Sequence, residues 1–136
     1  FQDQRKLIPY VILSSLRGEA TKLASGQRQI DWIYIDDVVE GLLATALAAN
    51  AEGKTIDIGS GQSHSIRTLV QMLVRLCQVD VAPLFGALND RPFEQVRVAN
   101  VEHSLNLTGW KPSVSLEEGL RQTVDWYARR EKEGPL

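Results

Sequence analysis

Cysteine, methionine and long apolar runs are all scarce in this 136-residue sequence, and each scarcity removes a class of protein. One cysteine, Cys77, cannot form an intramolecular disulfide framework, which favours a cytoplasmic setting. No apolar run approaches the roughly 18 residues of a membrane-spanning helix, and no signal-peptide pattern opens the chain. The chain starts at Phe1 and its single methionine, Met72, lies mid-chain, so we expect a processed, truncated or subcloned segment.

An excess of one charge is also missing. The chain has 15 basic and 17 acidic side chains, with the signs interspersed and a formal net charge of −2. This balance gives no electrostatic footprint for nucleic acid. Apolar residues make up 43% of the chain, which is enough to build the core of one domain over residues 1–136.

Metal-ligating and nucleophilic motifs are lacking as well. The two histidines, His64 and His103, have no cysteine, histidine or acid at the spacing of a metal site. No Gly-x-Ser-x-Gly elbow is present, although a Ser–His–Asp triad assembled only in space stays open. Cys77 lies on the apolar stripe of a predicted helix, so we interpret it as core packing.

The most informative stretch that is present runs from Gly26 to Gly41. Apolar and polar side chains alternate over Ile30–Ile35, which predicts a strand, and the period then becomes helical over Asp36–Ala49. One face of that helix is apolar and carries Val38, Val39, Leu42, Leu43, Ala46 and Leu47.

Asp36 and Asp37 stand where the strand pattern gives way to the helical one. Paired carboxylates can perform acid–base chemistry. A carboxylate at a helix N-terminus can also accept backbone N–H bonds and complement the helix dipole. We favour capping, because the position alone explains both residues.

Four further helices and four further short strands are expected. The helices are predicted at Lys6–Leu16, Ser65–Cys77, Asn100–Gly109, with Asn100 as cap, and Ser115–Arg130, with a capping box of Ser115 and Glu118. The strands are predicted at Lys22–Ala24, Lys54–Ile58, Val81–Leu84 and Gln95–Val98. This alternation indicates an α/β fold, or α+β for the isolated chain, with too few strands for a complete doubly wound sheet.

The loop Gly59–His64 follows a predicted strand and precedes a helix, where a dinucleotide-binding fingerprint would lie. His64 replaces the third glycine of that fingerprint, and its side chain would obstruct close helix–strand packing. We therefore favour a glycine-rich turn, with Ser63 or Ser65 as the helix N-cap.

Arg91 is a candidate anion ligand. It lies in the polar loop Asn89–Glu94, where Pro92, the next residue, restricts the backbone conformation of Arg91. A guanidinium on a stiffened loop suits bidentate recognition of phosphate or carboxylate. From the residues alone, a solvated surface arginine remains the alternative.

Five stretches, in this order, resemble the C-terminal half of the extended short-chain dehydrogenase/reductases, the NAD(P)-dependent nucleotide-sugar epimerases and dehydratases. LIPYVI (Leu7–Ile12) resembles the helix after the family's GP turn, and IDWIYIDDVVEG (Ile30–Gly41) resembles its RDWIYVDDVV block. The other three are TIDIGSGQSHSIRTLV (Thr55–Val70), similar to the YNIGSG strand and helix, RPFE (Arg91–Glu94), similar to RPGD, and LTGWKPSVSLEEGL (Leu107–Leu120), similar to LGWKP and SLEEGL.

The resemblance implies the substrate-binding portion of such an enzyme, with an incomplete Rossmann sheet. In this family the N-terminal half carries the glycine-rich NAD(P) fingerprint and a Tyr-x-x-x-Lys pair, whose tyrosine is the acid–base catalyst. This sequence lacks the pair: the residues four after its tyrosines are Ser14, Val38 and Glu131. We therefore expect the N-terminal Rossmann domain, the NAD(P) site and the catalytic residues to be absent from this chain.

The resemblance also implies substrate contacts, at Leu7, Ala24, Ser25, Arg28, Arg91 and Glu94. Arg91 would grip the diphosphate or ribose, and Glu94, which replaces the family's aspartate, would contact the ribose. Leu7 and the segment Leu23–Ser25 would border the nucleotide base. Ile30 stands where the family often has an arginine that reaches the phosphates, and Arg28 would partly substitute for it.

The sequence therefore predicts the nucleotide-sugar-binding portion of an isomerase or lyase that is not catalytic by itself. The parent reaction would move hydride from a sugar carbon to NAD(P)+, follow with epimerisation or elimination, and return the hydride. Two alternatives stay open: a self-associating interaction module with an unpaired Lys54–Ile58 edge, and one half of a split enzyme. Expected partners are a nucleotide sugar and either a second copy or a separate Rossmann half, with no nucleic acid or membrane.

Overall fold

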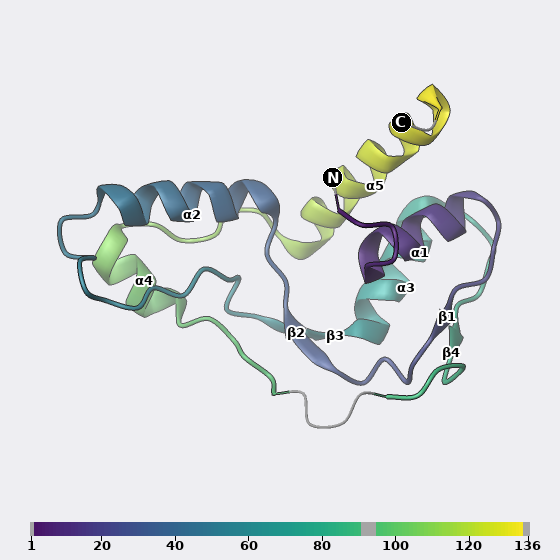
Figure 1. The fold of residues 1–136 in the computed structure, drawn as a ribbon, viewed down its shortest axis with the longest axis horizontal. Helices are drawn as coiled ribbons and strands as arrows, with labels where there is room; N and C mark the ends of the chain where they lie inside the picture. The colour runs from purple at the N-terminus through teal and green to yellow at the C-terminus, as the bar shows by residue number, and fades with distance from the viewer. Residues whose placement is uncertain (1, 91–94, 135–136) are drawn as a thin grey trace. The chain divides into compact units, whose positions relative to one another are not determined.

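The computed structural model describes residues 2–90 and 95–134, and over these residues the chain has the mixed α/β fold that the sequence predicts (Figure 1). The helices are α1 (Leu7–Leu16), α2 (Ile35–Leu47), α3 (Ile66–Cys77), α4 (Val101–Thr108) and α5 (Leu116–Glu133). The strands are β1 (Lys22–Leu23), β2 (Gln29–Asp31), β3 (Ser63–Ser65) and β4 (Leu84–Phe85). No helix in the described part of the chain is both long and apolar enough to cross a membrane.

The described residues group into two compact units. Residues 2–28, 65–90 and 120–134 form unit 1, and residues 29–64 and 95–119 form unit 2. The interpretation of residues 1–136 as one domain stays a prediction.

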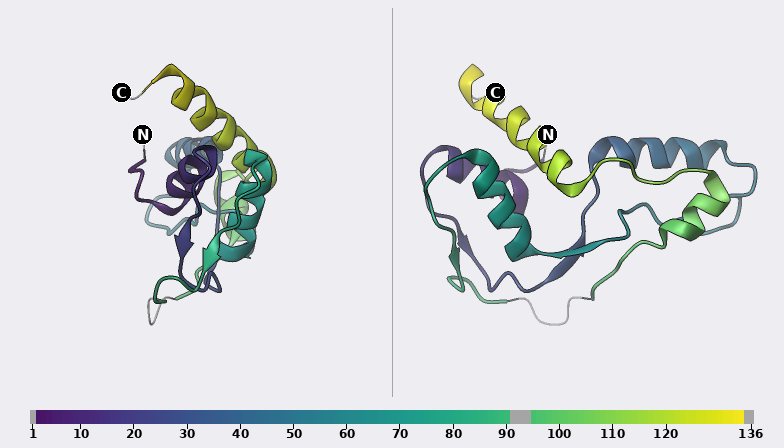
Figure 2. Two further views of the ribbon diagram at one scale, coloured as in Figure 1. Left: turned by 90° about the vertical axis from the view of Figure 1, so that its right-hand side faces the viewer. Right: turned by 180° about the vertical axis from the view of Figure 1, so that it is seen from behind.

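The core of unit 1 lies between α1 and α3, which pack side by side (Figure 2). The fully buried side chains at this contact are Val11, Ile12, Leu69, Val70 and Leu73. α3 begins as predicted, because the Ser65 side chain accepts a hydrogen bond from Thr68 N (3.0 Å) and so satisfies one of the free N–H groups of the first turn.

β1 and β4 form a parallel pair in unit 1, in the register Lys22↔Leu84 and Leu23↔Phe85. The predicted strand at Lys22–Ala24 is confirmed, whereas the strand predicted at Val81–Leu84 lies later along the chain. The pairing continues past β1, since Gly86 N donates to Ala24 O (3.1 Å). This extension fixes the backbone that leads out of β1.

Unit 2 contains α2 and α4, which contact each other, and Trp110, which follows α4 and lies against Gly41 of α2. A Cβ at Gly41 would lie 3.1 Å from the Trp110 ring, so the glycine lets the helix approach the indole closely. α4 is capped as predicted: the Asn100 side chain accepts from His103 N (3.0 Å), and Gly109 ends the helix at φ 73°.

The strands predicted at Lys54–Ile58 and Gln95–Val98 are wrong. The described residues form only two two-stranded sheets, β1 with β4 and β2 with β3, and neither segment belongs to them. A strand needs a neighbour to complete its backbone ladder. Asp57 is instead held by α4, since its carbonyl accepts from Ser104 Oγ (2.7 Å) and its carboxylate from Asn100 N (3.1 Å).

The predicted capping role of Asp37 is also wrong. α2 begins at Ile35 after an N-cap residue, Tyr34, that makes no side-chain capping bond. The Asp37 carboxylate, 1% exposed, accepts from Ser113 N, Ser113 Oγ and Val114 N, each at 3.0 Å. It therefore binds a loop 76 residues away along the chain, because a carboxylate in the first helical turn can turn outward as well as back.

Cys77 is half-buried at the end of α3, and burial raises the pKa of its thiol from 9.0 to about 11. Because the thiolate is the reactive form, we expect iodoacetamide at about pH 8 to modify the native chain tenfold or more slowly than the urea-unfolded chain. Stability should also fall between about pH 9 and 11, where the unfolded thiol ionises and the folded one stays neutral. Mass spectrometry of the alkylated chain measures the rates, and equal rates would contradict the prediction.

Candidate functional site

The chain leaving β1 is joined to residue 90 by two hydrogen bonds. Ser25 donates from its backbone N and its Oγ to Asp90 Oδ1, at 3.1 and 2.9 Å. The two residues are 65 positions apart in the sequence. Asp90 directly precedes Arg91, so one predicted substrate segment, Ala24–Ser25, lies beside the residue that enters the other.

Arg67, in the first turn of α3, also contacts Ser25. Its Nη2 donates to Ser25 O (2.8 Å), and its Cζ lies 3.9 Å from the centroid of the Phe85 ring, which places the guanidinium over the aromatic face. Its Nε is buried and has no hydrogen-bond partner among the described residues. We call Ser25, Arg67, Phe85 and Asp90 the Ser25 cluster.

Gly26 is required for this arrangement. Its φ of +75° is a left-handed conformation that side chains disfavour. A Cβ there would also lie 3.0 Å from Phe85 Cε1 and 3.1 Å from Arg67 Cβ. The absence of a side chain at Gly26 therefore allows the β1 segment to lie directly against α3 and β4.

The predicted substrate-contact residues lie in different parts of the structure. Ala24 and Ser25 are half-buried and lie at the cluster. Leu7 begins α1, the helix whose Tyr10 hydroxyl accepts from Lys22 N (3.1 Å). The Arg28 side chain is exposed, and its carbonyl accepts from Ile66 N (2.9 Å). Arg91 and Glu94 lie outside the described residues.

Sequence reasoning missed three residues of the cluster: Arg67, Phe85 and Asp90. One available signal was the place of Arg67, since a cation in the first turn of a helix faces the positive end of the dipole. The partners themselves, Ser25 and Phe85, are remote in sequence and left no local pattern.

We predict that Arg67→Ala lowers the free energy of unfolding by about 1–2 kcal/mol, through loss of the Ser25 bond and the aromatic contact. Arg5→Ala is the control, because Arg5 is 90% exposed and its salt bridge to Asp3 lies at the surface, where little change in stability is expected. Urea unfolding followed by tryptophan fluorescence measures both. Equal midpoints for the two variants would show that Arg67 contributes nothing.

The residues of the glycine-rich loop Gly59–His64 do not fit a dinucleotide. The amides of Ser60 and Gly61, which would have to face a diphosphate, donate instead to the Asp31 carboxylate at 2.8 and 3.0 Å. A Cβ at Gly59 would lie 2.6 Å from Ala99 Cβ and 2.7 Å from Asp31 Oδ2. The glycines therefore allow close packing within unit 2. This agrees with the interpretation of the loop as a glycine-rich turn.

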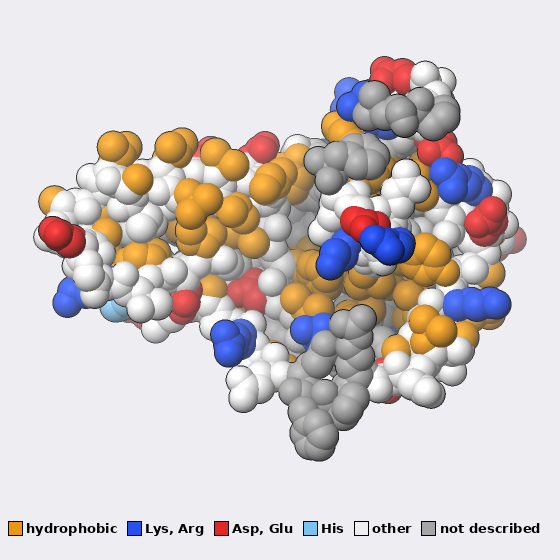
Figure 3. Space-filling model, viewed as in Figure 1, with side chains coloured by type: hydrophobic (Ala, Val, Ile, Leu, Met, Phe, Trp, Pro, Cys, Tyr) orange, Lys and Arg blue, Asp and Glu red, His pale blue; other side chains and the backbone are white. Residues whose placement is uncertain are grey.

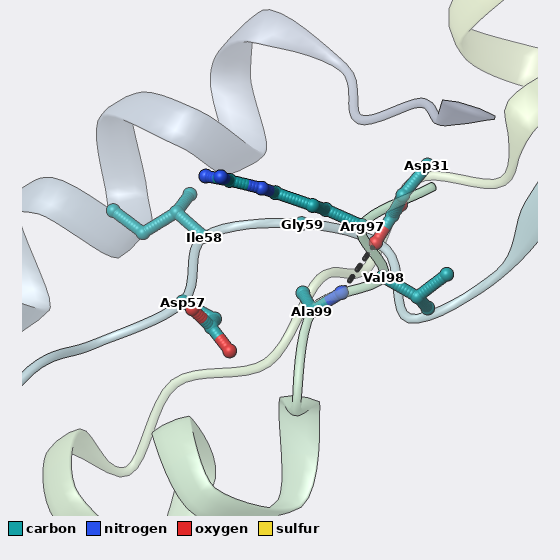
Figure 4. A pocket seen from close by; sticks show the side chains of 7 residues that line it. All are labelled: Asp31, Asp57, Ile58, Gly59, Arg97, Val98 and Ala99. Atoms are coloured by element: carbon teal, nitrogen blue, oxygen red, sulfur yellow. Dashed lines mark hydrogen bonds between the residues drawn. The ribbon is translucent and has the colours of Figure 1, made fainter. Parts of the chain in front are cut away.

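A pocket of about 210 Å³ lies beside this loop, lined by Asp31, Asp57, Ile58, Gly59, Arg97, Val98 and Ala99 (Figure 4). Asp31 also accepts from Ala99 N (2.9 Å), the bond drawn in the figure, and the Arg97 side chain extends across the pocket towards Ile58. Of the predicted substrate contacts that the structure describes, which are Leu7, Ala24, Ser25 and Arg28, none lines it. No group of three metal-ligating side chains occurs within residues 2–90 and 95–134.

Comparison with known proteins agrees with this fold. A sequence model of the NAD dependent epimerase/dehydratase family matches residues 2–59. The dTDP-glucose 4,6-dehydratase 1 of Escherichia coli (strain K12) is 31% identical over 138 residues, a match that covers 93% of this chain and 37% of that protein.

Two solved structures are similar along nearly the whole chain. The UDP-glucose 4-epimerase of Thermotoga maritima, solved with UDP-glucose, has a TM-score of 0.85 and 25% identity, covering 96% of this chain and 42% of its own. The UDP-glucuronic acid 4-epimerase of Bacillus cereus, in complex with UDP-glucuronic acid and NAD, has a TM-score of 0.84 and 25% identity, covering 95% and 41%.

The fold is thus that of the extended short-chain dehydrogenase/reductases, of which this chain carries a part. Its sequence is similar to that of the NAD dependent epimerase/dehydratase family over residues 2–59. It spans a little over a third of the length of the curated relatives that it matches.

Proposed function

We propose that this chain is the nucleoside-diphosphate-sugar-binding portion of an NAD(P)-dependent sugar epimerase or dehydratase and is not catalytic by itself. The observation that carries the proposal is the pair of hydrogen bonds from Ser25 to Asp90. They join Ser25, in a segment that the family resemblance assigns to the substrate, to Asp90, which precedes Arg91 in the sequence, and Arg67 and Phe85 contact each other in the same cluster.

The proposed substrate contacts are of two kinds: charged side chains that would bind the phosphates and ribose, and residues that would border the base. Arg91 would bind the diphosphate by charge-assisted hydrogen bonds and Glu94 the ribose hydroxyls. Leu7 and the half-buried Ala24–Ser25 backbone would border the base. Arg28 would supply part of the positive charge that the family often places at the position of Ile30.

Two observations support the absence of catalysis. The family's Tyr-x-x-x-Lys pair does not occur in the sequence. Burial raises the pKa of Tyr34 and of Tyr127, and the carboxylates of Asp36 and Glu118 add to the effect at Tyr34. A catalytic tyrosine of this type needs a lowered pKa, so neither phenol suits the role. NAD(P) and a cytoplasmic setting are assigned to the parent enzyme and stay predictions.

Titration of the isolated chain with UDP-, dTDP-, CDP- and GDP-sugars by calorimetry tests the proposal. We expect saturable binding of one nucleotide class, weakened about tenfold or more by Arg91→Ala, because a charge-assisted bond to phosphate is worth roughly 1.5–3 kcal/mol. Arg5→Ala, which removes a surface arginine of unit 1, should bind like the unchanged chain.

Three outcomes count against the proposal. Absence of binding by every nucleotide sugar would favour the interaction module. Equal affinity of the chain and Arg91→Ala would remove Arg91 from the site. Turnover of a nucleotide sugar with added NAD+ and no other protein would contradict the claim that the chain is inactive alone.

A further inference from the structure

The backbone carbonyls around Ser25 already have hydrogen-bond partners. Those of residues 23–26 all accept a hydrogen bond. In chain order the donors are Leu88 N (3.2 Å), Gly86 N (3.1 Å), Arg67 Nη2 (2.8 Å) and Arg67 N (2.9 Å). The Ser25 N–H is used as well, since it donates to Asp90 Oδ1. A ligand beside this segment therefore meets backbone groups whose bonds are already made, and side-chain atoms are better placed to recognise it.

Two side chains of the Ser25 cluster keep hydrogen-bonding atoms that nothing uses within the described residues. Both bonds to Asp90 end on Oδ1, so its Oδ2 accepts none there. The Arg67 side chain donates only from Nη2 in the same part of the chain, so the N–H groups of Nη1 are unpaired there. Asp90 is exposed and Arg67 is half-buried.

Both side chains are fixed by the atoms that are in use. Asp90 is held by two donors of Ser25, at 3.1 and 2.9 Å. Arg67 is held by Ser25 O and by the Phe85 ring, whose centroid lies 3.9 Å from its Cζ. A carboxylate can only accept hydrogen bonds and a guanidinium can only donate them. An acceptor and a donor are therefore attached to the same residue, in an arrangement that exists before any ligand binds.

Long-range charge does not select among nucleotides at this site. Basic and acidic side chains are interspersed over the face shown in Figure 3, and the formal net charge is only −2. Every nucleoside-diphosphate sugar carries the same diphosphate, so a broad field acts on all of them alike. Discrimination between bases has to come from particular hydrogen-bonding side chains.

The bases differ in the pattern that such a pair of side chains can read. Uracil, thymine and guanine carry a ring N–H beside a carbonyl oxygen, which is a donor beside an acceptor. Cytosine and adenine carry an unprotonated ring nitrogen beside an amino group, which is an acceptor beside a donor. A carboxylate beside a guanidinium complements the first pattern and opposes the second.

We propose that Asp90 and Arg67 determine the base specificity of the bound nucleotide sugar. Asp90 Oδ2 accepts the ring N–H of uracil, thymine or guanine, and Arg67 Nη1 donates to the neighbouring carbonyl oxygen. Cytosine and adenine are disfavoured, because their ring nitrogen would face a carboxylate with no proton between them. This inference rests on the proposed function, which places the base beside Ala24 and Ser25.

Matched pairs of ligands test the base preference. Calorimetric titration of the chain uses UDP-glucose against CDP-glucose and GDP-glucose against ADP-glucose, so that the sugar, ribose and diphosphate stay constant within each pair. We expect the first member of each pair to bind about tenfold or more tightly, because the second leaves the carboxylate facing another acceptor.

Asp90→Asn changes the proposed base contact and little else. The new side chain keeps one oxygen that can accept both bonds from Ser25, and it replaces the other oxygen by an NH2 donor. The ratio of UDP-glucose to CDP-glucose affinity should therefore fall about tenfold or more. Asp80→Asn is the matched control, since it makes the same substitution at an exposed carboxylate of unit 1 and should leave the ratio unchanged.

A second variant keeps the test decisive if Asp90→Asn disturbs the cluster. Arg67→Met removes the donor to the carbonyl oxygen and should lower the same affinity ratio about fivefold. Hydrogen exchange at the Ser25 amide reports whether the Asp90→Asn variant keeps the bond to Ser25. If that exchange becomes fast, the ratio measured for Arg67→Met decides.

The outcomes separate this inference from the proposed function. Equal affinity for UDP-glucose and CDP-glucose, or a preference for CDP-glucose, would overturn the assignment of Asp90 and Arg67 while nucleotide-sugar binding stands. So would a ratio that neither Asp90→Asn nor Arg67→Met changes. Absence of binding by all of the ligands would overturn the proposed function and this inference together.

Discussion

Asp37→Ala is expected to lower the free energy of unfolding by roughly 3–5 kcal/mol, because three hydrogen-bond donors lose their acceptor, a carboxylate that is itself only 1% exposed. Two of the three are backbone N–H groups, of Ser113 and Val114, which cannot turn towards solvent without moving the loop. Since whole domains are stable by only about 5–15 kcal/mol, this change should shift the urea midpoint far down.

Asp36→Ala is the matched control for Asp37. Asp36 lies in the same helical turn with an exposed side chain, so its loss removes only the dipole interaction, worth below about 1 kcal/mol. Circular dichroism during urea unfolding measures both variants. Coincident curves would mean that the bonds to Ser113 and Val114 contribute no stability.

The second large effect is expected at Asp31. Its carboxylate accepts from Ser60 N, Ser60 Oγ, Gly61 N and Ala99 N, and so ties the glycine-rich loop to the segment before α4. Asp31→Ala should cost roughly 2–4 kcal/mol, somewhat less than Asp37→Ala because Asp31 is only half-buried and water can replace some of the bonds. Hydrogen exchange should rise at the amides of Ser60, Gly61 and Ala99 together.

Asp57→Ala provides the comparison for Asp31. The Asp57 side chain is exposed and accepts one backbone bond, from Asn100 N at 3.1 Å, so its removal should cost about 1 kcal/mol or less. If exchange at Gly61 and Ala99 stays slow in Asp31→Ala, other contacts hold the loop and Asp31 is dispensable.

Local sequence determined the parts of the fold that depend on local hydrogen bonds. The cap at Asn100 is confirmed, and the cap of α3 is Ser65, one of the two serines predicted for it, because in both caps the acceptor and the N–H group are three residues apart. The strand pattern of Lys54–Ile58 is equally clear, but a strand forms only when a neighbour completes it, and none is present in the described residues. The alternation of apolar and polar residues is present in Lys54–Ile58, but the strand that it predicts does not form in the described residues.

The candidate site was harder to predict for the same reason. Leu7, Ala24, Ser25, Arg28, Arg91 and Glu94 came from a family resemblance rather than from spacing. The bond that joins Ser25 to Asp90 spans 65 residues, and the bond from Asp37 to Ser113 spans 76. Nothing in the local chemistry of an aspartate distinguishes a helix cap from an acceptor for a distant loop, because both offer the same oxygen atoms to N–H groups.

The two units are interleaved along the chain, which passes between them after residue 28, after residue 64, between residues 90 and 95, and after residue 119. The bond from Ile66 N to Arg28 O (2.9 Å) closes residues 29–65 into a loop. Once unit 1 is folded, the first segment of unit 2 is therefore already a ring, and the entropy lost when that ring folds is smaller than for a free chain. Folding of unit 1 therefore lowers the entropy cost of folding unit 2. Because each unit is built from separate segments of the chain, no single cleavage of the chain separates one intact unit from the other.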